Sequence, residues 1–141
     1  MTVLIDTDVV LDYMLRREPF ADAVFNCIDY LTVNKSNIWL TASTVTDIYY
    51  VSNRTLKKAS AAKKIVATLL HSYQVAAVSK TDCINALCSQ CVDYEDALTS
   101  ICAERVKAKY IITRNLKGFN ESSIPAISPE AYLSKYATPK D

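Results

Sequence analysis

Residues 92–115 read VDYEDALTSICAERVKAKYIITRN, in which acids precede an apolar helical run and the run precedes a short strand. The spacing predicts a helix over Asp93–Val106 and a strand over Tyr110–Ile112. Three acids occupy the start of this helix: Asp93, Glu95 and Asp96. Acids at this position either satisfy the free amides of the first helical turn or hold a cation.

The periodicity of this helix separates an apolar side from an acidic side, because successive residues are rotated by about 100°. The residues predicted to be buried are Tyr94, Leu98, Ile101 and Cys102. Asp93 and Asp96 lie on the opposite side, and Glu95 lies apart from both. Asp96 can therefore project into a cleft above a sheet, while helix capping explains the same acids without any ligand.

The same alternation of short apolar strands and helices continues through the chain. The other predicted strands are Val3–Ile5, Ile38–Leu40, Val75–Val78 and a short one at Ala126–Ile127. The other predicted helices are Ala21–Leu31, Ser43–Leu56, Ala59–Leu70, Lys80–Cys91 and Pro129–Tyr136. Nearly all-apolar strands separated by helices predict a parallel sheet covered on both faces, which makes the fold class an open α/β sandwich.

The composition is that of one globular domain. The chain has 141 residues, 50% hydrophobic and 22% charged, with a formal net charge of +1. We expect a single domain over residues 1–136 and a flexible tail over residues 137–141. The opening apolar run meets acids at once, so we expect no signal peptide or membrane span and predict a cytoplasmic protein. A single glycine argues against glycine-rich phosphate loops, and a single histidine against a Ser-His-Asp arrangement.

The five cysteines are an odd number and lie in apolar helical patterns. They are predicted to be free, buried thiols rather than a disulfide framework. Cys88 and Cys91 do form one C-x-x-C pair. A zinc site would need two further soft ligands at suitable spacing, and the only histidine, His71, lies well away in sequence.

One long stretch of the chain is basic, because no acid occurs between Ile48 and Thr81. Its basic residues are Arg54, Lys57, Lys58, Lys63, Lys64 and Lys80. Two interpretations remain open for it: a solvated helical face, or a face that contacts RNA.

Acidic and amide side chains gather where the predicted strands end. Asp6 ends the first strand, Asp47 lies one turn into the helix that Ser43 is predicted to cap, and Asn115 follows the strand at 110–112. Because the carboxyl ends of parallel strands share one edge, we expect Asp6, Asp47 and Asp96 to meet there. Their mutual repulsion is relieved most simply by a hard divalent cation with oxygen ligands.

Several stretches together resemble the PIN domain, the α/β nuclease domain of VapC-type toxins: LIDTDVVLDYMLRREPF, LTASTVTDIYYV, and DYEDALTSICA with AKYIITRNLKGF. The resemblance covers essentially the whole chain and implies a PIN-like α/β/α sandwich with a central parallel sheet of four to five strands. It implies an endoribonuclease that hydrolyses RNA phosphodiester bonds with Mg²⁺ or Mn²⁺, as the toxin of a toxin–antitoxin pair. Asp6, Asp47 and Asp96 match the catalytic, metal-binding acids. A cognate antitoxin and a homodimer are the expected protein partners.

The chain departs from the family pattern at three positions. Asp47 stands where the family usually has Glu, and Asp8 stands where Asn or Ser is more common. Asn115 replaces a fourth acid found in many members, which favours one bound ion over two. The residues expected to support the metal ligands are Asp8, Asp93, Thr113 and Asn115. The expected RNA contacts are Arg16, Arg17, Arg54 and Arg114, with Lys57 and Lys58 further out.

Two other functions remain open. The segment from Asp6 to Val10 fits the D-x-D-x-[TV] pattern of haloacid dehalogenase-like phosphatases, which would leave Asp47 and the helix after Asp93 without a role. Alternatively, the domain is PIN-like but has lost catalysis and serves as an RNA- or protein-binding module. The neutral Asn115 is the residue that favours this last alternative.

Overall fold

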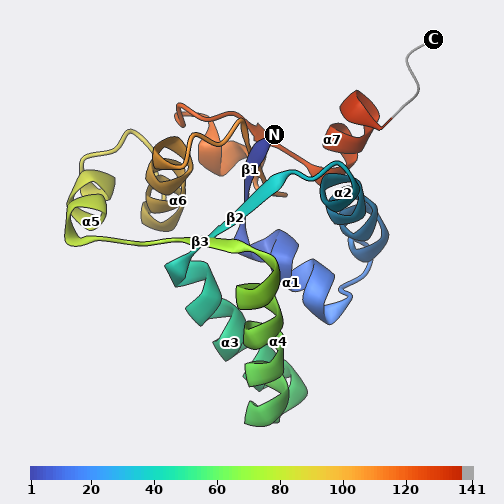
Figure 1. Ribbon diagram of the computed structural model, residues 1–141. Coiled ribbons are helices and arrows are strands. Elements are labelled where there is room, and N and C mark those ends of the chain that lie inside the picture. Colours follow the sequence, from blue (N-terminus) through green and yellow to red (C-terminus); the bar gives the residue numbers. More distant parts are fainter. Residues whose placement is uncertain (138–141) are drawn as a thin grey trace.

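The computed structural model describes residues 1–137, and its centre is a sheet of five parallel strands (Figure 1). The strands are β1 (Thr2–Ile5), β2 (Asn37–Thr41), β3 (Gln74–Ala76), β4 (Tyr110–Ile112) and β5 (Ala126–Ile127). Their order across the sheet is β3-β2-β1-β4-β5, and all neighbouring pairs are parallel. The predicted α/β sandwich is confirmed, with β1 as the central strand.

Helices cover both faces of this sheet. They are α1 (Thr7–Leu15), α2 (Ala21–Val33), α3 (Ala42–Leu56), α4 (Ala59–Ser72), α5 (Lys80–Leu87), α6 (Tyr94–Arg105) and α7 (Pro129–Tyr136), with a 3-10 turn η1 (Leu116–Phe119). Val3 and Ile5 of β1 belong to the core beneath α1, α2 and α7. Leu4, which points to the other face, packs with Cys102 of α6 and Phe119 of η1.

The helices on both faces of the sheet explain why the strands are continuous apolar runs in the sequence. Both faces of β1 and β4 are buried, so every residue of Tyr110–Ile112 is apolar or aromatic and buried. Each such side chain stabilises the fold by roughly 1.5–3 kcal/mol relative to full exposure. The central strands are therefore rigid supports for whatever follows their carboxyl ends.

Several element boundaries differ from the sequence prediction. Helix α1 begins directly after Asp6, which caps it, although no helix was predicted there. Helix α3 is capped by Thr41 rather than Ser43, because the strand turns into the helix at once and the Thr41 hydroxyl accepts from the Thr44 amide at 3.1 Å. Tyr94, predicted to be buried, is 44% exposed, and its hydroxyl donates to the carbonyl of Cys83 in α5.

The third crossover also differs in its details. Helix α5 ends at Leu87 instead of Cys91, and β3 ends at Ala76, so that Ser79 can cap α5 in a reciprocal pair with Asp82. Of the predicted tail, residues 138–141 lie outside the described residues. Within residues 1–137, no helix is both long and apolar enough to cross a membrane.

Candidate metal centre

Asp6 occupies the centre of the carboxyl edge of the sheet. Its backbone amide donates to the carbonyl of Ile112 at 3.0 Å, which continues the pairing of β1 with β4. Its carboxylate accepts from the Thr7 amide at 2.9 Å and from the Thr113 hydroxyl at 2.8 Å. Only 8% of Asp6 is exposed. Burial raises the pKa of this carboxyl, against the lowering effect of its hydrogen bonds to Thr113 and Thr7.

Asp96 approaches the same edge from the first turn of α6. Asp93 caps this helix by accepting from the Asp96 amide at 3.0 Å, so the capping interpretation of Asp93 is confirmed. The side-chain amide of Asn115 donates to Asp96 Oδ2 at 3.1 Å. Burial first, and then the charges of Asp93 and Asp6, raise the pKa of Asp96 to about 6. Asp96 therefore lies in the first turn of a capped helix, and its pKa is also raised by the Asp6 carboxylate at the end of β1.

Glu95 is a site residue that the sequence analysis missed. Helical periodicity separates it from Asp93 and Asp96, but all three line the same cavity. The Glu95 side chain is long enough to reach the cavity although its position is rotated by about 100° from that of Asp96. Burial and then the charge of Asp47 raise the pKa of Glu95 to about 7. Asp47 itself does not line the cavity within the described part of the chain; it approaches the site through Glu95.

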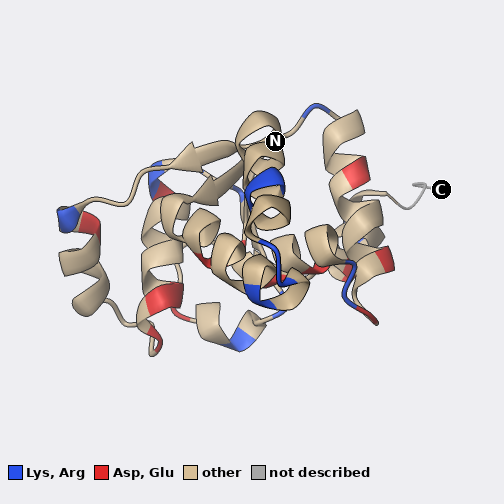
Figure 2. Ribbon diagram, turned by 90° about the horizontal axis from the view of Figure 1, so that it is seen from below, with Lys and Arg blue, Asp and Glu red and all other residues tan. Residues whose placement is uncertain are grey.

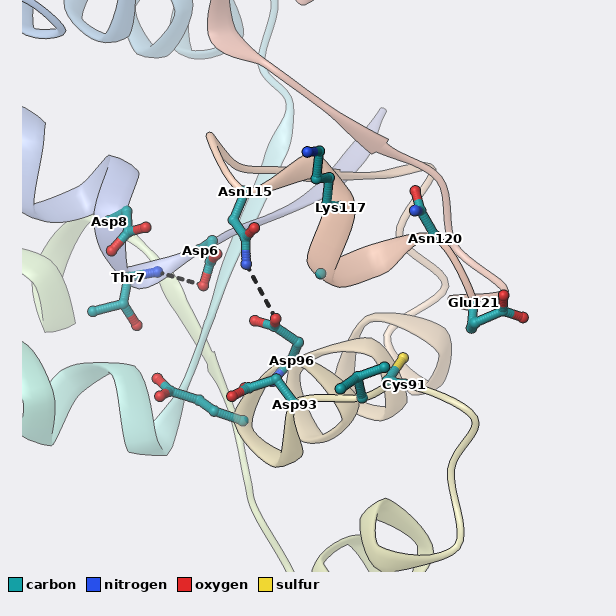
Figure 3. A pocket seen from close by; sticks show the side chains of 13 residues that line it. Asp6, Thr7, Asp8, Cys91, Asp93, Asp96, Asn115, Lys117, Asn120 and Glu121 are labelled. Atoms are coloured by element: carbon teal, nitrogen blue, oxygen red, sulfur yellow. Dashed lines mark hydrogen bonds between the residues drawn. The ribbon is translucent and has the colours of Figure 1, made fainter.

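The carboxylates open into one cavity of about 610 Å³ (Figure 3). Its carboxylate-bearing wall comprises Asp6, Asp8, Asp93, Glu95 and Asp96, and the opposite wall includes Asn115, Lys117 and Gly118. Glycine is required at this point of η1 for lack of space. A Cβ on Gly118 would lie 2.1 Å from Asp96 Oδ2 and 2.5 Å from Asn115 Nδ2. The only glycine of the chain thus stands where the turn meets the Asp96–Asn115 pair.

The chemistry of this donor set fits a hard divalent cation. The donors are carboxylate and amide oxygens, they are partly buried, and the pKa values of Asp6, Glu95 and Asp96 are all raised. Across residues 1–137, no three Asp, Glu, His or Cys side chains are close enough to hold an ion as they stand. An ion here would be held by fewer direct protein ligands, completed by water, or by side chains that rotate towards it. The Asp96 oxygen without a hydrogen-bond donor and the exposed Glu95 side chain allow such rotation.

The remaining predicted site residues are placed as follows. Thr113 is fully buried and links two site residues, because its hydroxyl donates to Asp6 and accepts from the Asn115 amide at 3.0 Å. Asp8 lines the cavity one residue beyond Thr7. Four residues predicted to support the ligands, Asp8, Asp93, Thr113 and Asn115, thus lie at the acidic cavity or bond directly to its side chains.

Two of the predicted RNA-binding arginines are held by a buried acid. Asp12 of α1 is 0% exposed and accepts from Arg17 Nε at 2.9 Å and Arg114 Nε at 2.7 Å. Arg17 also donates to the Asp8 carbonyl at 3.2 Å, and the Arg114 guanidinium lies 3.8 Å from the Phe20 ring centre. The guanidinium groups are therefore ordered beside the acidic cavity while both side chains stay partly exposed.

The other predicted RNA contacts are separate from this cavity. Arg16 is exposed at the end of α1 and lines a second cleft with Glu18 and Asp22. Arg54 is exposed in the last turn of α3, and Lys57 and Lys58 follow it in the turn to α4. Figure 2 shows Lys and Arg distributed over several elements rather than concentrated around the acids.

Comparison with known proteins gives the same fold. The family model described as PIN domain matches residues 2–117. No curated protein sequence matches the chain. Among solved structures, VapBC2 from Rickettsia felis bound to a promoter DNA fragment is similar, at 14% identity and a TM-score of 0.71, over 91% of this chain and 98% of that chain.

Two further structures are similar. FitAB bound to the IR36 DNA fragment aligns at 17% identity and a TM-score of 0.72, covering 91% of this chain and 95% of that chain. The Sarcin-Ricin loop cleaving toxin VapC20 from Mycobacterium tuberculosis aligns at 14% identity and a TM-score of 0.62, covering 77% and 86%. These TM-scores establish a shared fold, and the family match covers most of the chain. The chain belongs to the PIN domain family.

Proposed function

We propose that this protein is a metal-dependent endoribonuclease that hydrolyses RNA phosphodiester bonds. The observation that carries the proposal is the convergence of Asp6, Glu95 and Asp96 on one cavity, where burial and then the charges of neighbouring carboxylates raise the pKa of each. Such an arrangement is unfavourable without a counter-charge and favourable around Mg²⁺ or Mn²⁺. The PIN family match and the RNA-cleaving activity named for VapC20 support the substrate class.

The proposed ligands are Asp6 and Asp96, with Asp47 and Glu95 as further oxygen donors directly or through water. When bound, the ion lowers the pKa of a water molecule and neutralises charge that develops on the phosphate. Thr7 and Thr113 hold the Asp6 carboxylate in place. Asn115 holds one oxygen of Asp96 and leaves the other free to face the cavity. These contacts orient the acids before substrate arrives.

One ion is proposed rather than two. Asn115 is neutral and donates its amide hydrogen to Asp96, so it occupies the place of a potential ligand without adding negative charge. Arg17 and Arg114 are proposed to contact phosphates that flank the scissile bond, because Asp12 holds both guanidinium groups beside the cavity. Arg16 and Arg54 are proposed as outer contacts of a longer RNA.

The test is cleavage of a mixed structured RNA by purified protein with Mg²⁺ or Mn²⁺. We expect cleavage that EDTA abolishes and that Asp6→Asn and Asp96→Asn each reduce by at least about 100-fold. Asp29→Asn, an exposed acid of α2, is the matched control and should retain full activity. Folded wild-type protein that leaves RNA intact with either ion would refute the proposal.

We also propose a toxin role with a cognate antitoxin, which the similarity to VapBC2 and FitAB, both solved bound to DNA, supports. A homodimer is proposed as well. Co-purification of a small protein encoded beside the gene, and the mass of the complex in solution, would test both statements.

The catalytically inactive alternative has one observation in its favour, the neutral Asn115 bonded to Asp96. It predicts RNA binding that Asp6→Asn leaves unchanged and no cleavage in any metal. The phosphatase alternative leaves Glu95 and Asp96 without a role, and the PIN family match weighs against it. Hydrolysis of a small phosphate ester without RNA cleavage would support it.

A further inference from the structure

The acidic cavity is longer than the cluster of acids that defines its inner end. In Figure 3, Asp6 and Asp8 lie at one end, Asp93 and Asp96 in the middle, and Asn120 and Glu121 at the far end. We use the name outer half for the part formed by two segments, residues 91–92 and residues 117–121. The outer half opens directly into the part lined by the acids, but its own side chains are of mixed kinds: basic, amide, acidic and apolar.

The volume of the cavity exceeds what an ion requires. A divalent ion with a shell of six waters occupies roughly 200 Å³, at about 30 Å³ per water. The cavity measures about 610 Å³, so most of it is left for another occupant that must touch the ion site. Under the proposed function, on which this inference rests, that occupant is the RNA next to the scissile phosphate.

The side chains of the outer half suit one nucleotide. Lys117 is the only basic side chain among the described residues that line the cavity, and it can contact a phosphate. Asn120 carries both a donor and an acceptor, and Glu121 carries only acceptors, so both can read the edge of a base. Val92 is a fully exposed apolar side chain, against which a base face can pack.

The wall formed by residues 117–121 is held against the rest of the protein by contacts on both sides of Asn120 and Glu121. Phe119 is buried beneath η1, next to Asn120. The Ser122 hydroxyl bonds to the Ser100 hydroxyl of α6 at 2.6 Å, which fixes the chain just after Glu121. On the opposite wall, the Cys91 amide donates to the Ser89 hydroxyl at 3.1 Å. Polar side chains on such anchored segments are suited to specificity, because little order must be gained on binding.

We propose that the outer half binds the nucleotide flanking the scissile phosphate of single-stranded RNA, with Lys117 on its phosphate and Asn120 and Glu121 on its base edge. A single strand is required because pairing would hide the base edge from these side chains. Glu121 accepts hydrogen bonds only, so it favours base edges with an exocyclic amine, as in adenine, cytosine and guanine. Uracil offers only its N3–H, between two carbonyl oxygens that repel the carboxylate.

The first test compares cleavage of short single-stranded RNAs that vary at one position beside the cut. Asn120→Ala and Glu121→Gln should reduce the discrimination between bases by about tenfold while Mn²⁺ binding stays unchanged. Lys117→Ala should raise KM more than it lowers kcat, since the phosphate contact exists before the transition state. Lys135→Ala on α7 and Glu130→Gln are the controls. Unaltered base preference in both Asn120→Ala and Glu121→Gln would overturn the proposal while the ribonuclease function stood.

The second test does not require cleavage. The four nucleoside monophosphates are titrated with Mg²⁺ present, and backbone amide shifts are followed by NMR. Saturable shifts in residues 91–92 and 117–121, weakened by Lys117→Ala and Asn120→Ala, would support the site even for a protein that fails to cut RNA. Shifts that are absent from these two segments would refute the site whether or not the protein cleaves RNA.

Discussion

At the scale of single residues, the hydrogen bond between Asp96 and Asn115 depends on the absence of a side chain at Gly118. Gly118 has no side chain, and the Asp96 carboxylate and the Asn115 amide occupy the space that a Cβ would need. The φ angle of Gly118 is not positive, so the glycine is needed for space rather than for backbone conformation. The residue is remote in sequence from Asp96 and becomes a neighbour only through η1.

Gly118→Ala should lower RNA cleavage by about 100-fold, because the added carbon forces the Asp96 carboxylate to rotate away from Asn115. The check is a double-mutant cycle with Asp96→Asn, measured as kcat/KM. If Gly118 acts through Asp96, the double variant should be no slower than Asp96→Asn alone. Additive losses would show that Gly118 affects activity by another route.

Asp12 is the other residue on which local order depends. It is completely buried and satisfied by two guanidinium groups. Asp12→Ala should lower the free energy of unfolding by about 2–4 kcal/mol, measured in urea, because it leaves Arg17 and Arg114 without their shared partner. Arg17→Ala, which leaves Asp12 paired with Arg114, should cost less. Equal losses in the two variants would argue against a shared anchor.

At the scale of elements, α5 is joined to α6 by a charged side-chain pair. Asp82 caps α5 together with Ser79 and accepts from Arg105 of α6. The hydrogen bond from Arg105 is the main cause that holds the pKa of Asp82 below its usual value. This pairing positions the crossover that delivers Asp93 and Asp96 to the cavity.

The Asp82 pair gives a pH dependence. A lowered pKa in the folded state means that the stabilisation is complete above the unfolded value of about 3.9 and is lost as pH falls through the lower, folded value. Asp82→Asn should therefore reduce stability at pH 7, and its difference from the wild type should shrink as the pH falls below about 4. Urea unfolding at several pH values checks this. A difference that grows towards low pH would contradict it.

Element boundaries were predicted with mixed success: the ends of β4, β5 and α7 match the prediction, whereas the starts of β1, β2 and α3 do not. β4 was predicted with its observed ends, because its three residues are all buried and the residues on either side are polar. The start of α3 was misplaced by choosing Ser43 over Thr41, since both hydroxyls suit a cap and only the strand end selects between them.

At the scale of the whole molecule, the acidic cavity lowers the stability of the folded protein. Bringing like charges together at one edge destabilises the metal-free protein, and a bound cation reverses the sign of this term. The molecule has a net charge of only +1, so the proposed binding of RNA at this region would depend on the ion and on nearby arginines.

Asp6→Asn should raise the Tm of the metal-free protein by a few degrees, at roughly 3–6 °C per kcal/mol, since it removes a charge that is buried beside other acids. This gain should outweigh the loss of one of the two oxygens that accept hydrogen bonds from Thr7 and Thr113. Mn²⁺ should raise the Tm of the wild type and leave that of Asp6→Asn almost unchanged. Thermal unfolding with and without Mn²⁺ measures both effects. A Tm increase with Mn²⁺ that is equal in both proteins would place the ion elsewhere.

The amino-acid pattern was enough to predict the α/β class, the parallel sheet, and the approach of Asp6, Asp96 and Asn115 at one edge. It was enough because strand periodicity and crossover connections depend on local patterns and on general rules of chain topology. Asp47, expected at the same place, reaches the site only through Glu95. Three features became visible only once the chain was folded: Glu95 lines the cavity, Asp12 binds Arg17 and Arg114, and Gly118 leaves space for Asp96. Those contacts join residues far apart in the chain or depend on side-chain reach, and no local pattern encodes the space between two elements.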